Sequence, residues 1–334
     1  MNSKTKQKSV SALAWLDSDN VKNDPRLLEP GRPQSEPGRW LPFIFLHAGC
    51  LLVFPYGVSA AALWTCGILY FLRMFAITGF YHRYFSHRTF KTCRAMQFIF
   101  AVIGCMSVQR GPLWWAAHHR KHHAASDTDE DIHSPVARDF LWSHIAWITS
   151  TKNMLTDYSR IGDFARYPEL RWLNRFDWFV PLVLFFSLYA LGQWMGLSYP
   201  ATQTNGMQML AWGFFVSTTI LFHATAAINS VAHLAGYRRY DTPDNSRNNA
   251  ILAIFTLGEG WHNNHHRYSN CTRQGIAWWE VDVTYYVLRI FETLGLVSGI
   301  KRIPADALQQ AKQAMPSNND TPFVKNASVD RSSR

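Results

Sequence analysis

The chain has 334 residues, of which 15% are aromatic and only 17% are charged, and its formal net charge is +10. This composition is unusual for a soluble domain, so an integral membrane protein is the first class to test. The five cysteines form no C-x-x-C pair and are interpreted as packing residues of a reducing compartment, which argues against a disulfide-stabilised secreted protein.

Residues 1–39 are polar and rich in proline, and they lack the apolar core of a cleavable signal peptide. We therefore expect this segment to be a flexible cytoplasmic tail, and we expect the residues 304–334 to be a second flexible tail. The intervening residues 40–303 would form a single membrane domain.

Four apolar stretches in that domain approach the roughly 20 residues that a helix needs to cross the hydrocarbon core of a bilayer. They cover residues 40–54, 58–80, 176–199 and 207–232. The first is short and the second contains Arg73, but tight connectors at 55–57 and 199–206 join them into two hairpins. The sequence therefore predicts an all-α integral membrane protein with four transmembrane helices in two hairpins and a cytoplasmic helical cap.

Lysines and arginines gather in the segments outside the two hairpins. Seven lie in residues 1–40, thirteen in 81–175 and twelve after His233, whereas neither hairpin connector carries one. Because cytoplasmic loops retain positive charge, both termini and the cap are expected on the cytoplasmic side. This asymmetry also disfavours the alternative that the apolar stretches are buried helices of a soluble enzyme.

Two pieces of the cap, residues 140–148 and 278–291, are amphipathic and rich in aromatic side chains. Trp and Tyr are enriched where a membrane meets water. We therefore expect both pieces to be helices that lie on the bilayer surface, with Trp142, Trp147 and Trp278 among their anchors.

Eight of the fourteen histidines fall into three clusters, namely His82 and His87, then His119, His122 and His123, then His262, His265 and His266. On a helix, positions i, i+3 and i+4 share one face, so each H-x-x-H-H cluster can present three imidazoles to one point. His82 and His87 lie about 140° apart on a regular helix, so they can share a site only if the second transmembrane helix ends or bends near Phe85.

A further polar pair, Asn229 and His233, lies at i and i+4 near the cytoplasmic end of the fourth apolar stretch. Alone, His233 would be an interfacial packing residue, but polar groups at this depth are costly unless they bind something. Eight or nine histidines exceed the three or four that one zinc ion takes, so two metal ions are the natural interpretation. Imidazole suits iron, copper, nickel and zinc alike, which leaves the metal open. The weaker candidates are His47, His118, His133, His144 and His223.

At these residues the chain resembles the membrane-bound fatty acyl desaturases, specifically the stearoyl-CoA (Δ9) desaturase type. The resemblance spans roughly residues 40 to 300, and its four motifs in order are HRYFSHR from His82, HRKHH from His119, NSVAH from Asn229 and GWHNNHH from Gly260. It implies that two irons are held by nine histidines, which are His82, His87, His119, His122, His123, His233, His262, His265 and His266. Asn229 would contribute through a water molecule.

The function implied by the resemblance is an O2-dependent oxidoreductase that introduces a cis double bond, at the Δ9 position, into a saturated acyl chain. Its cofactors would be two iron ions with O2 as co-substrate. Electrons would come from an external ferredoxin or cytochrome b5-like protein, because no haem or flavin motif is recognisable in the sequence. The other expected partners are the fatty acyl substrate and membrane lipids, and no nucleic acid.

The surroundings of the metal site can also be predicted. Outer contacts to the imidazoles are expected from Asp127, Asp129, Asp131 and Glu259. The acyl chain is expected in an apolar tunnel that runs under the cap between the transmembrane helices. In the resembled family, bulky residues about three turns along the second transmembrane helix close the far end of the tunnel. Tyr70, about 18 Å along a helix from His82, occupies that place, although it could also be packed between helices.

One departure from the family concerns the acyl carrier. In the animal enzymes the two residues before the second cluster are Arg-Asp, which help hold coenzyme A, whereas Ala117 and His118 stand here. A CoA-linked substrate is expected, but a lipid-linked one stays open. Cationic side chains that could attract its phosphates are Arg83, Arg88, Lys91, Arg120 and Lys121.

Two other functions are compatible with the histidine pattern. A di-iron fatty acyl hydroxylase or oxidase would share the metal architecture and differ only after the first hydrogen abstraction. A membrane zinc hydrolase or a metal transport protein would use the histidines as zinc ligands, but the clusters contain no clear catalytic carboxylate and too many ligands for one zinc. The sequence leaves four points open. They are the chain length of the substrate, the electron donor, the oligomeric state and the histidines that bind each iron.

Overall fold

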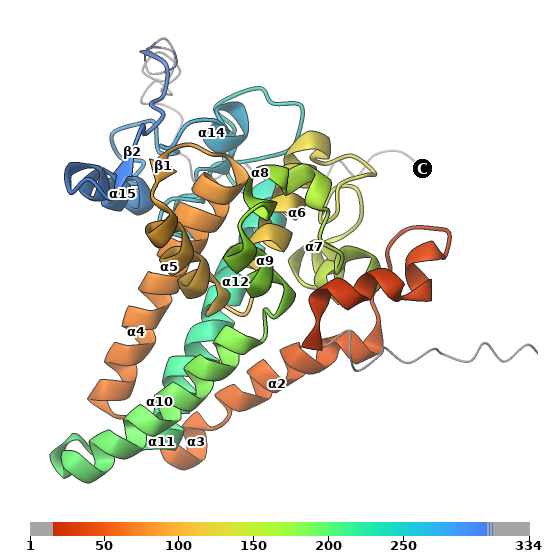
Figure 1. Ribbon diagram of the computed structural model, residues 1–334. Coiled ribbons are helices and arrows are strands. Elements are labelled where there is room, and N and C mark those ends of the chain that lie inside the picture. Colours follow the sequence, from red (N-terminus) through yellow and green to blue (C-terminus); the bar gives the residue numbers. More distant parts are fainter. Residues whose placement is uncertain (1–15, 306, 308, 310–334) are drawn as a thin grey trace, which may run out of the picture.

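The computed structural model describes residues 16–305, 307 and 309 of the chain. In this part, long helices form a stalk beneath a broad cap of short helices and loops (Figure 1). The α-helices are α2 (Leu41–Cys50), α3 (Val53–Tyr56), α4 (Ala60–Phe75), α5 (Arg94–Cys105), α6 (Pro112–Ala125), α7 (Phe140–His144), α8 (Gly162–Ala165), α9 (Pro168–Arg175), α10 (Phe179–Ser198), α11 (Gly206–Met209), α12 (Ser217–Ser230), α13 (Ala250–Phe255), α14 (His262–Arg267) and α15 (Val283–Thr293). The π-helices are η4 (Ala76–Ser86) and η9 (Leu210–Val216).

Short 3₁₀ helices and one small sheet complete the described part of the chain. The 3₁₀ helices are η1 (Ser18–Asn23), η2 (Pro25–Leu28), η3 (Pro37–Trp40), η5 (Ala146–Thr149), η6 (Thr151–Asn153), η7 (Tyr158–Ile161), η8 (Pro200–Thr202) and η10 (Val231–His233). Strand β1 (Lys91–Thr92) pairs antiparallel with β2 (Val297–Ser298), with Lys91 opposite Ser298. This pairing ties the end of the cap to the loop that follows η4.

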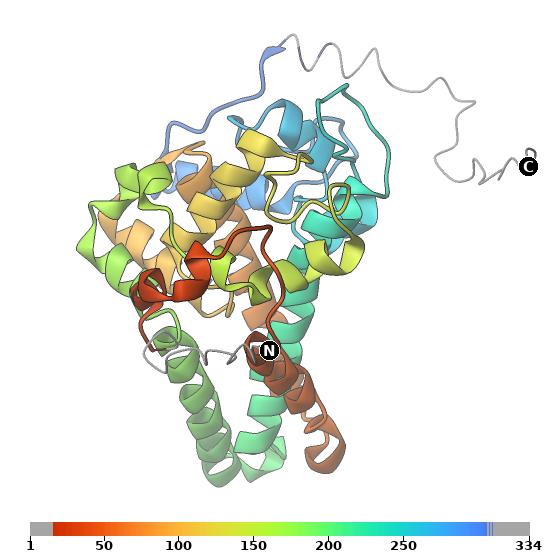
Figure 2. The same ribbon diagram turned by 90° about the vertical axis from the view of Figure 1, so that its right-hand side faces the viewer.

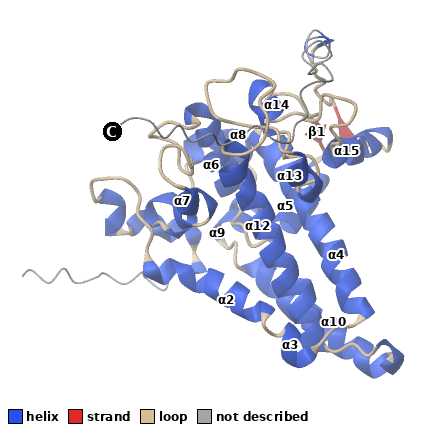
Figure 3. Cartoon of the chain, turned by 180° about the vertical axis from the view of Figure 1, so that it is seen from behind, coloured by secondary structure: helices blue, strands red, loops and turns tan. Residues whose placement is uncertain are grey.

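Four helical stretches are long and apolar enough to cross a membrane. They are Pro37–Tyr56, Ala60–Ser86, Phe179–Ser198 and Gly206–His233. Large apolar side chains such as Trp64, Phe186 and Leu197 are exposed on the stalk, as expected of helices whose outer surface faces lipid. Figure 3 shows these helices running together away from the cap. The predicted all-α fold with four transmembrane helices is confirmed.

Arg73, the charge inside the second apolar stretch, is fully buried in the stalk. Its guanidinium donates hydrogen bonds to Ser217 Oγ (2.5 Å), to Thr218 Oγ1 (2.7 Å) and to the Met106 carbonyl (3.2 Å). These acceptors replace the water that a charge would otherwise require. Arg73 thereby joins α4 to α12 within the membrane-crossing part.

The second transmembrane stretch changes from α-helix to π-helix before it reaches its first histidine. In a π-helix each N–H donates to the carbonyl five residues earlier, so residues i and i+5 lie one above the other. The N–H of His87 donates to the His82 carbonyl in this way, at 3.2 Å. The rings of His82 and His87 are consequently only 4.9 Å apart, centroid to centroid. The predicted bend near Phe85 therefore takes the form of a π-helix that ends at Ser86.

An aromatic core fixes η4 within the cap. Phe80 stacks on Phe100 of α5 with ring centroids 4.0 Å apart, and Phe75 meets both rings edge-on. The Tyr81 hydroxyl donates to the Ala101 carbonyl on the same helix, α5. Because close-packed aromatic rings leave a helix little freedom, this core holds the histidines of η4 in place.

Residues 16–39 pack against the cap instead of forming a flexible tail. Arg175 pairs with Asp17 (2.6 Å), Ser18 Oγ donates to Asp177 (3.2 Å), and Lys152 Nζ donates to the Glu29 carbonyl (2.6 Å). Figure 2 shows this red segment lying across the cap. The tail prediction is wrong here, because the polar residues that suggested disorder are engaged by partners far along the chain. Residues 1–15, 306, 308 and 310–334, which belong to the two predicted tails, lie outside the described residues.

The two tryptophans of residues 140–148 face the interior of the cap. Trp142 and Trp147 are buried, and Trp147 stacks on Trp114 of α6 with centroids 5.6 Å apart. The prediction that Trp142 and Trp147 anchor this piece at the bilayer surface is therefore wrong, whereas Phe140 and Leu141 are exposed and the interfacial position of the piece stays a prediction. Trp278 is exposed, and the predicted piece 278–291 becomes helical at Val283.

Candidate active site

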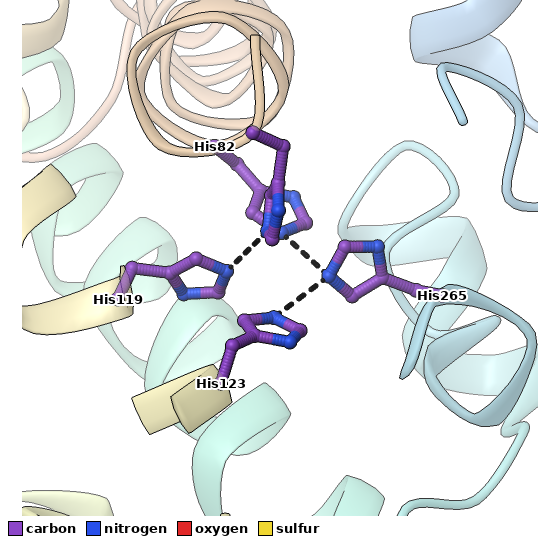
Figure 4. Close-up of side chains that lie close together, drawn as sticks. His82, His119, His123 and His265 are labelled. Atoms are coloured by element: carbon purple, nitrogen blue, oxygen red, sulfur yellow. Dashed lines mark hydrogen bonds between the residues drawn. The ribbon is translucent and has the colours of Figure 1, made fainter. Parts of the chain in front are cut away.

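The nine histidines singled out in the sequence lie together in the cap and divide into two groups. Within each group, one nitrogen of every ring lies within 4.8 Å of a nitrogen of every other ring. The first group contains His82, His87, His119, His123 and His265, and the second contains His122, His233, His262 and His266. Figure 4 shows four rings of the first group turned toward a common centre.

Two helices contribute to both groups. On α6, His119 and His123 face the first group while His122 faces the second. On α14, His265 belongs to the first group, whereas its neighbours His262 and His266 belong to the second. The two H-x-x-H-H motifs thus divide their rings between two adjacent sites instead of presenting three imidazoles to one point.

The distances between ring nitrogens fit metal ligation. The Nε2 atoms of neighbouring rings are 2.8 Å apart for His87 and His119, 3.0 Å for His82 and His265, 3.0 Å for His265 and His123, 3.1 Å for His233 and His262, and 3.0 Å for His266 and His262. Two imidazole nitrogens bound side by side to one metal, each at about 2.0–2.1 Å, lie roughly 3 Å from each other. Each group can therefore hold one metal ion.

Hydrogen bonding alone does not account for the second group. Nδ1 of His233 donates to Asp127 and Nδ1 of His266 donates to Asp244, which leaves an unprotonated Nε2 on each neutral ring. Both of these nitrogens face Nε2 of His262, which carries at most one proton. At least one of these two nitrogen contacts therefore has no proton directed along it. A cation at the centre of the group resolves this conflict.

Four buried carboxylates hold the outer nitrogens of the imidazoles. The contacts are His82 Nδ1 to Glu259 (2.5 Å), His122 Nδ1 to Asp131 (3.0 Å), His233 Nδ1 to Asp127 (3.0 Å) and His266 Nδ1 to Asp244 (2.5 Å). Carboxylates in this position fix the tautomer and the orientation of a metal-binding histidine. The predicted contacts of Asp127, Asp131 and Glu259 are confirmed.

The predicted contact of Asp129 with an imidazole is wrong, and the contact of Asp244 was not predicted. The side chain of Asp129 is 76% exposed and pairs with Arg32 on the surface, at 2.8 Å. Asp244 takes the expected place beside His266. It follows Thr242 and Pro243 in a loop whose composition is that of an ordinary turn, so the sequence carries no signal for its role.

Arg83 lies beneath the first group and holds Glu259 in place. Its guanidinium is buried and contacts Glu259 (3.0 Å), Asp282 (3.0 Å) and the Thr272 carbonyl (2.8 Å). The expectation that Arg83 could attract a phosphate of the substrate is therefore wrong, because its charge is used inside the cap. Arg120 is engaged in a similar way by Asp163, at 3.0 Å.

Two asparagines of the third motif lock α14 to its surroundings. Asn263 Oδ1 accepts from the N–H groups of Arg239 and Tyr240, both at 2.8 Å. Asn264 Nδ2 donates to Glu280 (3.1 Å) and its Oδ1 accepts from Asn248 (2.9 Å). These fully buried amides orient a helix of only six residues, so the three histidines of α14 are rigidly positioned.

The electrostatics of the site favour neutral rings among ionised carboxylates. Burial lowers the pKa of His119, His123, His262 and His265 well below the ordinary value. Burial alone would raise the pKa of Glu259, but the charges of His82 and Arg83 lower it to about 2. Although burial opposes it, the charge of Asp131 raises the pKa of His122. Neutral imidazole is the form that binds metal, so the burial of His119, His123, His262 and His265 favours ligation.

All five weaker histidine candidates lie outside both groups. His47, His223 and His144 form a hydrogen-bonded chain with nitrogen distances of 2.9 Å that ends on Ser230 Oγ. His118 Nδ1 donates to the Trp114 carbonyl at 2.9 Å. The fifth, His133, is buried beside His122 and Asp131, and one atom of each of the three lies within 4.8 Å of the others.

Two cavities meet beside the histidine groups. A cavity of about 520 Å³ lies under the cap between α2, α10 and α12, and a second of about 50 Å³ extends toward Met74 on α4. Trp115, His119 and Asn229 border both. The expected apolar tunnel under the cap corresponds to these cavities. Asn229, whose contact through water stays a prediction, lies at their junction.

Tyr70 lies one helical turn beyond Met74, away from the histidines. It lines neither of the two described cavities, and its hydroxyl donates to the Phe255 carbonyl of α13 at 2.6 Å. The smaller cavity ends near Met74 and Thr256, on the two elements that Tyr70 joins. The role of Tyr70 as the tunnel end stays a prediction.

Comparison with known proteins agrees with this site. Residues 59–293 match the family model described as fatty acid desaturase. An acyl-CoA 5-desaturase of Anemone leveillei is 37% identical over 265 residues, which are 78% of each chain. An sn-2 palmitoyl-lipid 9-desaturase of Nostoc sp. is 36% identical over 83% of this chain and 95% of its own. Delta-9 acyl-lipid desaturase 1 of Arabidopsis thaliana is 34% identical over 81% and 85%, respectively.

A stalk of four helices long and apolar enough to cross a membrane, under a cap with two histidine groups suited to binding metal, defines the class as a membrane protein with a candidate metal centre. The family model covers well over half of the chain, and the relatives match across most of their length. The chain belongs to the fatty acid desaturase family. It is an oxidoreductase that desaturates fatty acyl chains, and its histidine groups are suited to binding metal.

Proposed function

We propose that the protein holds two iron ions and uses O2 to introduce a cis double bond at the Δ9 position of a saturated acyl chain. The observation that carries this proposal is the division of nine imidazoles into two adjacent groups. The first ion would be held by His82, His87, His119, His123 and His265. The second would be held by His122, His233, His262 and His266, with Asn229 acting through a water molecule. The Δ9 position is supported by the two relatives that are named for position 9.

When bound, two reduced irons together with O2 supply the strong oxidant that an unactivated methylene requires. The acyl chain loses two hydrogen atoms, and O2 with two electrons and two protons leaves as two water molecules. Glu259 and Asp244 retain the Nδ1 protons of His82 and His266, so that these rings present Nε2. Trp115, where the two cavities meet, borders the acyl chain, and apolar walls on both sides exclude water from the reacting carbons.

The source of the electrons and the orientation of the protein in the membrane are also part of the proposal. An external ferredoxin or cytochrome b5-like protein would deliver the electrons to the cap. The cap and both termini would lie on the cytoplasmic side, since lysine and arginine are confined almost entirely to these parts. The desaturase domain would comprise residues 40–303, which enclose the matched residues 59–293. A tag placed after residue 334 and one placed in the connector 199–206 should be accessible from opposite sides of sealed membrane vesicles.

The test is product and metal analysis of the same preparation. Cells that make the protein should accumulate acyl chains with a cis double bond nine carbons from the carboxyl end, and the purified protein should contain about two irons per chain. A hydroxylated product would instead indicate the related hydroxylase chemistry. Full activity with zinc as the bound metal would contradict the di-iron proposal and favour a zinc enzyme.

A further inference from the structure

The larger cavity is bordered by two helices that stand on different sides of the stalk. Its walls include Phe43 and Phe45 of α2, and Pro181, Leu182 and Phe185 of α10. In Figure 2, α10 (green) and α2 (dark brown) descend on the two sides of the view, with the cap above them. Phe214 and Phe222 of the fourth membrane-crossing stretch form the back of the cavity. Twelve of its 25 lining residues belong to membrane-crossing stretches, and the other thirteen lie outside them, so the cavity lies where the stalk meets the cap.

Three residues of the cavity wall also belong to the outer surface. Phe45 is 57% exposed, Leu182 is 43% exposed and Trp178 is 36% exposed. All three lie within or directly beside membrane-crossing helices. A side chain that borders both a cavity and the surface marks the mouth of that cavity. Phe45 and Leu182 belong to membrane-crossing helices, so a mouth beside them would open toward the bilayer that surrounds the stalk.

The charges around this mouth do not suit a carrier with several phosphates. Arg110 pairs with Asp177 at 3.2 Å and donates to the Met154 carbonyl at 3.0 Å. Arg39 is buried, donates to Thr151 Oγ1 at 3.0 Å and lies 4.0 Å from Glu36. Both arginines of the described wall are thus engaged by protein groups. A coenzyme A molecule would have to place its phosphates beside aromatic and aliphatic side chains, at a high desolvation cost.

We propose that the acyl chain reaches the histidine groups sideways from the bilayer, between α2 and α10, as part of a membrane glycerolipid. This inference rests on the proposed desaturase function and names its substrate class. The methyl end passes Leu182 and Phe45 first, runs beneath Trp114 and Trp115, and continues past Asn229 toward Met74. The ester and headgroup stay at the mouth near Trp178, in the zone where tryptophan prefers to lie.

The first experiment compares carriers in a reconstituted system. The metal-loaded full-length protein is placed in vesicles with a ferredoxin and its reductase. Stearoyl chains are supplied either within phosphatidylglycerol of the vesicle or as stearoyl-CoA, and each carrier is re-isolated before its acyl chains are analysed. Double bonds are expected on the lipid-linked chains, at a rate at least roughly tenfold above that on stearoyl-CoA. Equal or faster reaction of stearoyl-CoA would overturn the proposal.

A matched pair of substitutions tests the mouth itself. Leu182→Trp fills the mouth, whereas Val183→Trp adds the same bulk to the next residue of α10, which is 48% exposed and does not line the cavity. Overfilling a passage is costly, so Leu182→Trp should slow desaturation of the lipid-linked chain roughly tenfold and Val183→Trp should not. Equal rates for the two variants would overturn the sideways path.

A labelling experiment separates this inference from the proposed function, because it needs neither metal nor turnover. Phosphatidylglycerol that carries a photoactivatable diazirine in the middle of an acyl chain is added to vesicles that contain the protein. Trp114 lines the cavity and is buried in the cap, so a label on Trp114 must arrive through the cavity. Label is expected on Trp114 and should decrease in Leu182→Trp. If Trp114 is labelled by a diazirine acyl-CoA and not by the lipid, the proposal is contradicted even if the protein desaturates both carriers.

Discussion

Nδ1 of His266 donates a hydrogen bond of 2.5 Å to Oδ2 of Asp244, which precedes it by 22 residues. Asp244 is itself held by Ser246, whose N–H and hydroxyl both donate to Oδ1. This arrangement keeps the carboxylate ionised, and its pKa is lowered by the hydrogen bond from His266 although burial acts to raise it. A loop without any recognisable motif therefore orients one ring of the second histidine group.

Replacing Asp244 by Asn should impair metal binding through His266. An outer carboxylate typically contributes 10-fold to 100-fold to metal affinity or activity, so a loss of roughly that size is expected in both iron content and desaturation. Asp241→Asn is the matched control, because that carboxylate is fully exposed and pairs with Arg238 at the surface, at 3.6 Å. Iron per chain in the two purified variants decides the matter, and equal iron content would show that Asp244 does not support the site.

Removing a direct ligand should have a larger effect. His122→Ala or His265→Ala should abolish double-bond formation and leave the protein inserted in the membrane, because insertion depends on the apolar helices. His144→Ala serves as a control, since His144 lies outside both histidine groups. Desaturation is measured in cells by fatty acid analysis, alongside the amount of protein in the membrane fraction. Substantial desaturation by either variant would remove that histidine from the ligand set.

Asn229→Ala should lower activity less than the loss of a direct ligand, because a contact through water orients the site without holding the metal. A decrease of 10-fold to 100-fold is the typical cost of such an outer contact. Iron content should stay near that of the unmodified protein. If iron falls as far in this variant as in His122→Ala, Asn229 is itself a ligand and its assigned role is wrong.

Tyr70→Ala should shift the products toward longer acyl chains, with the double bond still at the same distance from the carboxyl end. The side chain lies one turn beyond the inner cavity, so removing it would lengthen the space available to the methyl end. Tyr70→Phe is the matched control, because it keeps the bulk and removes only the hydrogen bond to the Phe255 carbonyl. Both variants are supplied with saturated chains of mixed length. An unchanged profile in Tyr70→Ala would leave Tyr70 as a packing residue between α4 and α13.

The contribution of Glu259 to stability should depend on pH in a defined direction. Its pKa is lowered from 4.5 to about 2 in the folded protein, where burial opposes the shift and the charges of His82 and Arg83 produce it. A lowered pKa contributes stability that is present above the unfolded value of 4.5 and is lost as the pH falls through about 2. Glu259→Gln should therefore destabilise the metal-free protein by about 3 kcal/mol at pH 6 and by less than half of that at pH 3.

Denaturant unfolding in detergent at the two pH values measures this difference. Glu169→Gln is a suitable control, because Glu169 pairs with the exposed Arg94 at the surface of the cap. A Glu259→Gln defect that is the same at pH 6 and pH 3 would mean that packing, and not the charge of the carboxylate, accounts for it.

The four crossings and the nine histidines could be predicted because both follow from local patterns. A run of about 20 apolar residues is seldom part of a soluble protein, and histidine is too rare for three close clusters to arise by chance. The i, i+3 and i+4 spacing correctly placed three imidazoles on α6 and three on α14, but it could not show that each helix divides its rings between two sites. Asn229 and His233 were recognisable as a polar pair in an apolar segment.

The remaining features depend on contacts between residues far apart in the sequence. His82 and His87 share a site because η4 is a π-helix, and helical spacing alone placed them on different faces. Trp142 and Trp147 are of a residue type typical of membrane anchors, but both are buried in the cap, where Trp147 stacks on Trp114 of α6. Residues 16–39 are polar enough to resemble a tail, but partners more than a hundred positions away hold them against the cap.

By itself, the sequence determined the class of the protein and the histidines of the candidate metal site, because membrane insertion and histidine clustering are properties of short segments. Only the tertiary structure decided how these histidines divide into two groups, which carboxylates hold their outer nitrogens, and where the cavity opens. Each of these depends on the packing of helices that are distant in the chain, and local periodicity carries no information about which helix lies beside which.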